Sequence, residues 1–261
     1  PRSTLFPYTT LFRSGQTAPT VFADLWETLN QGKPWTGEFI NKRKNGEIYH
    51  EEAHISPVYD TNGTINRYVA VKLDITDRKQ YETRLQHLAR YDNLTDLPNR
   101  SLFSDLLQQT LALAKREQYC LALMFVDLDH FKEVNDTLGH AIGDLLLRDA
   151  AQRMQAAVRN SDVVGRIGGD EFVVLLTKLE VEQDALLVGE KLRRALETPF
   201  LLDGHRVTIS SSIGIALFPD HGSSEQELAL HADTAMYAAK QSGRNAVQLY
   251  SRAMARPAAH T

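Results

Sequence analysis

Two pairs of acidic residues lie at the ends of apolar segments that have the composition of buried strands. Asp127 and Asp129 end the run LALMFVDLD, and Asp170 and Glu171 follow the paired glycines of RIGGDEFVVLL. Clustered carboxylates repel and raise one another's pKa unless a cation neutralises them. If the two segments are neighbouring strands, Asp127 and Asp170 converge. Mg²⁺ would suit such a cluster, because it prefers oxygen ligands and leaves coordination positions for substrate phosphates.

The segments around these acids predict an α/β (α+β) domain in which helices flank a central, mostly antiparallel sheet of about five strands. Helices are expected after Asp144, where LLLRDAAQRMQAAVR has one apolar face, and over His231–Gln241. The predicted strands are 119–127, 163–167, 170–177, 207–217 and 246–250.

Composition limits the possible classes of protein. The chain has 261 residues, a net charge of -4 and 43% hydrophobic residues, which suits one large domain and a smaller one. This charge argues against nucleic-acid binding through a positive field. No apolar stretch approaches the ~20 residues of a membrane span, although a parent protein could be anchored upstream. The single Cys120 predicts a buried core residue and a reducing, cytoplasmic setting.

The first third of the chain predicts a small antiparallel sheet. Residues 21–30 suit a short helix, and the Asn-Gly pairs at 45–46 and 62–63 each separate two strand-like runs, which is typical of hairpins. A helix followed by a three-stranded meander is therefore expected.

This front region resembles the C-terminal half of a PAS sensor domain. The stretches TGEF, NKRK, NGE and the closing DIT carry the resemblance, which implies a partial sensor domain over 16–76 with an unidentified ligand or signal. Residues 1–15 fit nothing downstream and are expected to be a non-native leader.

A connecting helix is expected over 77–92. Tyr81, Leu85, Leu88 and Tyr91 are spaced by four, three and three residues, which places them on one helix face. This face would pack on its own chain or pair with a second copy as a short coiled coil.

Three ordered motifs carry a resemblance to the GGDEF-domain diguanylate cyclases. They are DLDHFKEVNDTLGHAIGD at 127–144, GGDEF at 168–172 and ADTAMYAAKQSGRN at 232–245. The resemblance implies a palm-like cyclase domain over 93–250, followed by a tail over 251–261. It also implies the condensation of two GTP into cyclic di-GMP, with release of two pyrophosphates.

The resemblance assigns a metal site and candidate catalytic groups. Asp127, the backbone carbonyl of Leu128 and Asp170 would hold Mg²⁺ or Mn²⁺, and Glu171 would add metal affinity. Asp170 would also accept the proton of the ribose 3′-hydroxyl. Lys132 would offset charge on the phosphates in the transition state.

Further residues of the motifs would bind GTP. Asn135 and Asp144 match the guanine readers of the family. A carboxylate can accept from N1–H and N2–H₂ of guanine, and adenine does not offer this pair of donors. The glycines would let the backbone approach the phosphates. The expected substrate-binding residues are Asn135, Asp144, Lys132, Gly168, Gly169, Lys240 and Arg244.

The sequence RNSD at 159–162 matches the RxxD spacing of the family's product-inhibition site. Arg159 would bind guanine or phosphate of cyclic di-GMP, and Asp162 would accept from guanine. Lys191 lies near the position where a second arginine often completes this site, but lysine lacks the bidentate fork of arginine.

A homodimer is expected, because one half-site carries one GTP and joining two requires a second copy, most simply by two-fold symmetry. Two alternatives stay open. The domain could bind GTP or cyclic di-GMP without turnover and regulate a partner. It could also regulate an EAL phosphodiesterase domain further along a longer protein.

Overall fold

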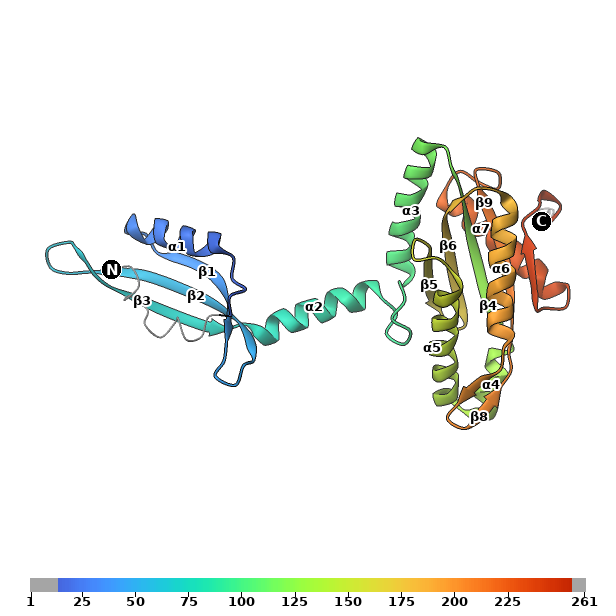
Figure 1. Ribbon diagram of the computed structural model, residues 1–261, viewed down its shortest axis with the longest axis horizontal. Coiled ribbons are helices and arrows are strands. Elements are labelled where there is room, and N and C mark those ends of the chain that lie inside the picture. The colour runs from blue at the N-terminus through green and yellow to red at the C-terminus, as the bar shows by residue number, and fades with distance from the viewer. Residues whose placement is uncertain (1–13, 255–261) are drawn as a thin grey trace, which may run out of the picture. The chain divides into compact units, whose positions relative to one another are not determined.

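The computed structural model describes residues 14–254, which divide into two compact units at the boundary between His87 and Leu88 (Figure 1). The expected leader lies outside the described residues except for its last two positions, and the expected tail except for its first four. Within the described part, no helix has the length and apolar character needed to cross a bilayer.

The first unit is a helix on a three-stranded antiparallel sheet, as predicted. Its core includes Leu29, Trp35 and Phe39, which lie between the helix and one face of the sheet. Glycines with positive φ, Gly46 at 93° and Gly63 at 78°, lie in the two hairpin turns. The elements are α1 (Pro19–Asn30), β1 (Trp35–Lys42), β2 (Ile48–Tyr59) and β3 (Ile65–Asp74), with strand order β1-β2-β3.

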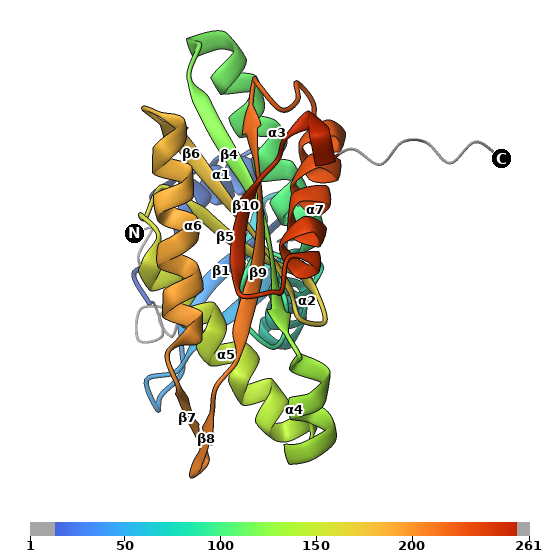
Figure 2. The same cartoon turned by 90° about the vertical axis from the view of Figure 1, so that its right-hand side faces the viewer.

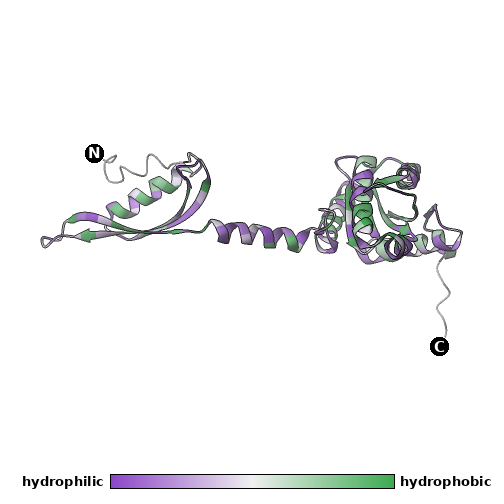
Figure 3. Cartoon of the chain, turned by 90° about the horizontal axis from the view of Figure 1, so that it is seen from below, coloured by the Kyte–Doolittle hydropathy of each residue, from purple (hydrophilic) through white to green (hydrophobic). Residues whose placement is uncertain are grey.

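Helix α2 (Thr76–Arg90) follows β3 and is largely hydrophilic (Figure 3). The carboxylate of Asp74 accepts hydrogen bonds from the side chain and backbone of Thr76 at the helix start, and these bonds lower the pKa of Asp74 to about 2. Three of the four apolar side chains predicted to share one face are exposed: Tyr81 by 68%, Leu85 by 65% and Leu88 by 42%. The fourth, Tyr91, lies beyond the end of α2, is half-buried and pairs with Pro98 in an isolated β-bridge.

The second unit contains the predicted five-stranded sheet, with strand order β10-β9-β4-β6-β5. Every neighbouring pair is antiparallel except β10 and β9, which are parallel. The central strand β4 therefore pairs with both β6 and β9. The strands are β4 (Cys120–Asp129), β5 (Val163–Gly168), β6 (Glu171–Leu179), β9 (Ser210–Phe218) and β10 (Ala246–Leu249).

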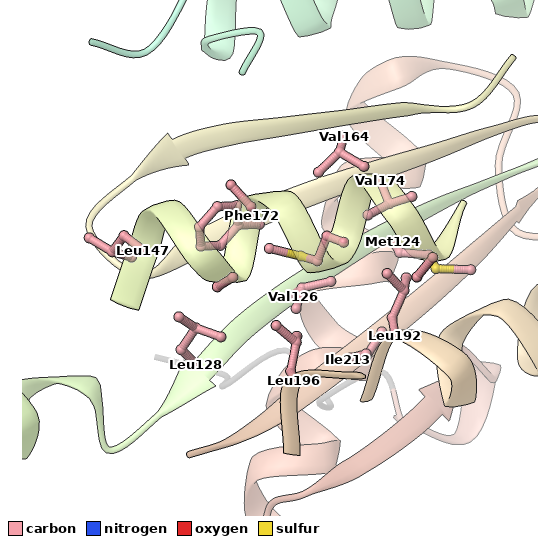
Figure 4. Close-up of a cluster of buried hydrophobic side chains, with 14 of the residues drawn as sticks. Met124, Val126, Leu128, Leu147, Val164, Phe172, Val174, Leu192, Leu196 and Ile213 are labelled. Carbon is pink, nitrogen blue, oxygen red and sulfur yellow. The ribbon is translucent and has the colours of Figure 1, made fainter. Parts of the chain in front are cut away.

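Helices cover both faces of this sheet (Figure 2). One face packs on α5 (His140–Ala157) and α6 (Glu182–Glu197), and the other packs on α3 (Arg100–Glu117) and α7 (Glu225–Gln241). Figure 4 shows the first of these cores, where Met124 and Val126 of β4 lie among side chains of the neighbouring strands and of α5 and α6. The sheet is therefore fixed from both sides, which gives its acidic end a rigid support.

Several details differ from the sequence-based expectations. The predicted strand 207–217 is broken, because β8 (His205–Val207) pairs with β7 (Phe200–Leu202) in a separate hairpin and β9 begins at Ser210. Cys120 is exposed, so its predicted burial was wrong. It is the first residue of β4, ahead of the buried part of the strand. No helix was predicted for α3, α4 (Phe131–Leu138) or α6, and α7 begins at Glu225 and not at the predicted His231.

Candidate functional site

The antiparallel pairing of β4 with β6 brings the two acidic segments together. Asp127 lies opposite Glu171 in the ladder, and the backbone N–H of Leu128 donates to the carbonyl oxygen of Asp170 at 3.3 Å. The acids at the end of β4 and at the start of β6 therefore lie side by side, as the strand arrangement predicted.

The pKa of the Asp127 carboxyl is raised above its ordinary value of 3.8. Burial raises the pKa of its carboxyl, the hydrogen bond and charge of Lys240 lower it, and the nearby carboxylates of Asp170 and Asp129 raise it further. Nζ of Lys240 lies 2.7 Å from Oδ2 of Asp127. In this structure Lys240, which we expected to bind triphosphate, therefore neutralises a carboxylate expected to bind metal.

Asp129 has a different role from Asp127. Its side chain is 2% exposed and accepts from the hydroxyls of Ser210 and Ser212, both at 2.7 Å, and from the backbone N–H of Asn245 at 3.1 Å. These bonds use its oxygens inside the domain, so Asp129 is a structural anchor for the β4 end.

The Gly-Gly turn between β5 and β6 is fixed by an arginine. Gly168 and Gly169 have φ values of 153° and 55°. Residues that carry a Cβ atom rarely adopt these values. Nε and Nη2 of Arg166 donate to the carbonyl oxygen of Gly169 at 3.0 and 2.7 Å, and its Nη1 donates to Oδ1 of Asp92 at 2.8 Å. Sequence reasoning missed this pair, although Arg166 stands two residues before the glycines.

The residues expected to read guanine lie on α4 and α5. Oδ1 of Asn135 is buried and finds no hydrogen-bond partner within residues 14–254. A Cβ atom at Gly143 would lie 1.9 Å from this oxygen, so only glycine leaves room for the amide. Asp144 and Lys132 are exposed. A buried acceptor without a partner indicates that a donor belongs there, and the N–H groups of a nucleobase are suitable donors.

The residues that we expected to bind phosphate lie at the C-terminal end of α7 and in the turn after it. Lys240 is on the last turn of the helix, and Arg244 is exposed in the turn that follows, with a φ of 63°. A cavity of about 640 Å³ lies beside the acids, and its lining includes Glu171, Lys240 and Met254.

The residues expected to bind product lie in the turn after α5 and on α6. Asp162 accepts from the backbone N–H groups of Arg159 at 3.1 Å and of Thr177 at 3.2 Å, which makes it a turn-stabilising residue as well. Arg159 is exposed at the end of α5. Lys191 is exposed on α6, and no hydrogen bond or ion pair in the described part of the chain joins it to Arg159 or Asp162.

The acidic cluster fits a cation that takes few protein ligands. Between residues 14 and 254, no three or more His, Cys, Asp or Glu side chains are arranged to hold a metal ion. The carboxylates of Asp127 and Asp170 lie near each other where the end of β4 meets the start of β6. Mg²⁺ is commonly held by one or two carboxylates, with waters and substrate phosphates at its other positions, so the donor set suits this ion.

The second unit is thus an α/β domain with an antiparallel central sheet, an acidic strand end and a nearby set of cationic residues. Residues 89–246 match the family model described as diguanylate cyclase, GGDEF domain, and residues 6–77 match a PAS domain model. The chain belongs to the GGDEF-domain diguanylate cyclase family.

Similar proteins come from Pseudomonas aeruginosa. The bifunctional diguanylate cyclase/cyclic di-GMP phosphodiesterase MucR is 47% identical over 170 residues, which cover 65% of this chain and 25% of MucR. The diguanylate cyclase TpbB is 44% identical over 166 residues, which cover 63% of this chain and 38% of TpbB. The chain therefore spans well under half the length of these relatives.

Solved structures agree with this family. The GGDEF domain of TpbB has a TM-score of 0.62 and 42% identity, over 63% of this chain and 96% of that one. The coiled coil and GGDEF domain of DgcB from Caulobacter crescentus, in complex with c-di-GMP, has a TM-score of 0.60 and 27% identity, over 67% and 93%.

Proposed function

We propose that the second unit is a diguanylate cyclase that joins two GTP into cyclic di-GMP and releases two pyrophosphates. The observation that carries the proposal is the meeting of Asp127 and Asp170 at one sheet end, beside Lys240, in a chain of the GGDEF family. The 44% identity to TpbB, a diguanylate cyclase, supports it.

In this proposal, each reaction forms a bond between a ribose 3′-oxygen and the α-phosphorus of the other GTP, while the bond to pyrophosphate breaks. Asp170 accepts the 3′-hydroxyl proton, and Lys132 and Arg244 bind the phosphates. Asp127, the carbonyl of Leu128, Asp170 and Glu171 hold Mg²⁺ or Mn²⁺. The bound cation would neutralise phosphate charge and lower the pKa of the 3′-hydroxyl.

In this proposal, Asn135 and Asp144 recognise guanine. The buried Oδ1 of Asn135 needs a donor, and the exposed carboxylate of Asp144 can accept two N–H groups of guanine. Adenine lacks the 2-amino group, so it would leave these acceptors unpaired. A site built to hydrogen-bond its substrate can reject such an analogue by roughly 10⁴-fold.

Activity in this proposal needs two copies, because each copy presents one GTP. The exposed apolar residues Tyr81, Leu85 and Leu88 on α2 support pairing through this helix. Arg159 and Asp162, with Lys191, would form a site at which cyclic di-GMP inhibits its own synthesis.

A second candidate function is regulation of a phosphodiesterase. MucR is bifunctional, and the cyclic di-GMP phosphodiesterase NbdA of P. aeruginosa is 40% identical over 168 residues, which are 21% of its length. In such a protein the GGDEF domain could bind GTP and control a hydrolase instead of making product.

The purified chain, incubated with GTP and Mg²⁺, tests these candidates. Pyrophosphate release and chromatographic detection of cyclic di-GMP are expected, with a specific rate that rises with protein concentration. Asp170→Asn and a reaction with ATP serve as inactive controls. Saturable GTP binding without pyrophosphate release at any protein concentration would reject the cyclase and favour regulation.

A further inference from the structure

The turn after α7 is held by a charged network from α6. Oδ1 of Asn245 accepts from Nη1 of Arg193 at 2.6 Å, and Nδ2 of Asn245 donates to Oε1 of Glu197 at 2.8 Å. The Arg193 side chain is 15% exposed and forms ion pairs with Glu190 at 2.8 Å and with Glu197 at 3.0 Å. Asn245 is therefore tied to a guanidinium that α6 itself holds in place.

The same asparagine contacts the acidic end of β4. Its backbone N–H donates to Oδ2 of the buried Asp129 at 3.1 Å. Asp129 lies two residues after Asp127 on the same strand, and its remaining partners in the described structure are two serine hydroxyls. The position of Asn245 therefore affects how the strand end that carries Asp127 is held.

The backbone of this turn requires outside support. Gly243, Arg244 and Asn245 have φ values of 111°, 63° and 47°. The left-handed region is unfavourable for the long side chain of Arg244, whereas asparagine adopts it more readily. Such conformations persist where the surrounding structure holds them. The backbone N–H of Arg244 donates to the carbonyl oxygen of Ala239 at 3.1 Å, and the bonds of the Asn245 side chain to Arg193 and Glu197 hold the next residue of the turn. Arg244 is the neighbour whose placement depends on this support.

Close packing leaves α6 little freedom near this network. A Cβ atom on Gly189 would lie 2.9 Å from Val247 on β10 and 3.1 Å from Ile215 on β9. Gly189 is one turn before Arg193, so the helix that carries the guanidinium is seated directly on the two strands beside the turn.

We propose that Arg193 is a positioning residue for the nucleotide site: through Asn245 it holds Arg244 and the acidic end of β4 where GTP binds. The inference rests on the proposed function, since it assigns Arg244 and Asp127 to the nucleotide site. Arg193 itself touches neither substrate nor metal.

Three variants and a control test the proposal. Arg193→Ala removes the guanidinium, and Asn245→Gly removes both side-chain bonds while tolerating the left-handed backbone. The double variant combines them. Arg194→Ala is the control, because Arg194 is on the same helix, is 73% exposed and pairs with Glu190 alone among the described residues. Initial rates are measured against GTP concentration, with product removed by a phosphodiesterase, and amide hydrogen exchange is followed over 243–246.

Both single variants are expected to raise KM for GTP by about tenfold, because Arg244, which binds phosphate in the proposed function, is no longer held in place. The double variant should be no worse than about threefold beyond Asn245→Gly, because that substitution already removes the bond that Arg193 makes to the turn. Exchange over 243–246 should accelerate in all three variants and stay unchanged in Arg194→Ala. Additive effects on KM, or a lower melting temperature with KM and exchange unchanged, would overturn the proposal.

The exchange measurement separates this proposal from the proposed function. A wild-type chain that releases no pyrophosphate would reject the cyclase, and GTP affinity by titration would then replace KM. Unchanged exchange over 243–246 in Arg193→Ala would reject the positioning role even in a fully active enzyme.

Discussion

Nζ of Lys240 and Oδ2 of Asp127 form an ion pair at 2.7 Å, at the point where nucleotide and metal are proposed to meet. Burial raises the pKa of Asp127, and Lys240 is the nearby cation that opposes this effect. Without nucleotide, Lys240 and a divalent cation therefore compete for one carboxylate. Bound triphosphate would give the ammonium group another anion to pair with.

Replacing Lys240 with Met keeps the apolar stem and removes the charge. Affinity for Mn²⁺ alone is expected to rise by about three- to tenfold, because a like charge near the site is lost. The KM for GTP should rise by about tenfold or more, because the phosphates lose a charged hydrogen bond. Electron paramagnetic resonance titration and steady-state kinetics measure the two effects. Lys115→Met, at an exposed position on α3, is the control, and weaker Mn²⁺ binding in Lys240→Met would contradict the competition.

The Arg166–Asp92 pair is expected to stabilise the second unit and its Gly-Gly turn. Both side chains are largely buried, at 10% and 22% exposed. Arg166→Ala should lower the free energy of unfolding by about 2–4 kcal/mol, because it leaves a partly buried carboxylate unpaired. It should also reduce cyclase activity, because Gly169 loses two donors. Urea denaturation measures the first effect. A double variant with Asp92→Ala should be less damaging than the sum, and strict additivity would show that the two side chains act separately.

The same pair predicts a pH dependence. Burial of Asp92 raises its pKa, but hydrogen bonds from Thr95 and Arg166 outweigh this and hold the pKa below its ordinary value of 3.8. The unfolded chain then binds the proton more tightly, so this stabilisation is complete above the unfolded pKa and is lost as pH falls through the folded pKa. The stability difference between wild type and Asp92→Asn should be constant from pH 7 to 5 and shrink below pH 3.8. A difference that grows on acidification would refute the sign.

Gly143→Ala tests the role of Asn135 in guanine binding without changing Asn135 itself. The new methyl group would lie 1.9 Å from Oδ1 of Asn135, so the amide must move. GTP affinity is expected to fall by about tenfold or more, although alanine is the better helix former by about 1 kcal/mol. Isothermal titration checks the affinity. In an Asn135→Ala background the methyl group fits, so Gly143→Ala should then cause little further loss; an equal loss in both backgrounds would disconnect the two residues.

Arg159 and Asp162 are expected to differ in their effects. Arg159 is exposed, so Arg159→Ala should change stability by less than about 0.5 kcal/mol and should weaken inhibition by cyclic di-GMP by about tenfold or more. Asp162→Ala should cost about 1–2 kcal/mol, because Asp162 accepts from two backbone N–H groups. Inhibition curves and thermal unfolding are compared for both. If cyclic di-GMP inhibits Arg159→Ala as strongly as it inhibits the wild type, the proposed product site is rejected.

Leu85→Glu tests pairing through α2. A charge on the exposed apolar face should shift the chain to monomer and lower the specific rate of cyclic di-GMP synthesis, because each copy presents one GTP. Gln86→Glu adds the same charge on another side of the helix and should leave both unchanged. Light scattering at assay concentrations reports the mass. A Leu85→Glu chain that remains dimeric would place the interface elsewhere.

Local patterns predicted most elements of the fold, and long-range contacts account for the rest. Apolar runs with the composition of buried strands predicted the main sheet, and Asn-Gly pairs between strand-like runs predicted the meander, because these features depend on neighbouring residues. The approach of Asp127 to Asp170 was predicted because acids stand at the end of one expected strand and at the start of another. The Lys240–Asp127 and Arg166–Asp92 pairs join residues 113 and 74 positions apart, and the sequence contains no local signal for their partners. Cys120 was mispredicted because a residue at the start of a buried strand has the same apolar neighbours as one inside it.

The guanidinium of Arg166 joins Asp92, in the segment that leads into the second unit, to Gly169, in the hairpin that carries Asp170. A displacement of that incoming segment would therefore reach the hairpin by two routes, the Arg166 side chain and the backbone N–H of Arg166, which donates to the carbonyl oxygen of Pro98 at 3.0 Å.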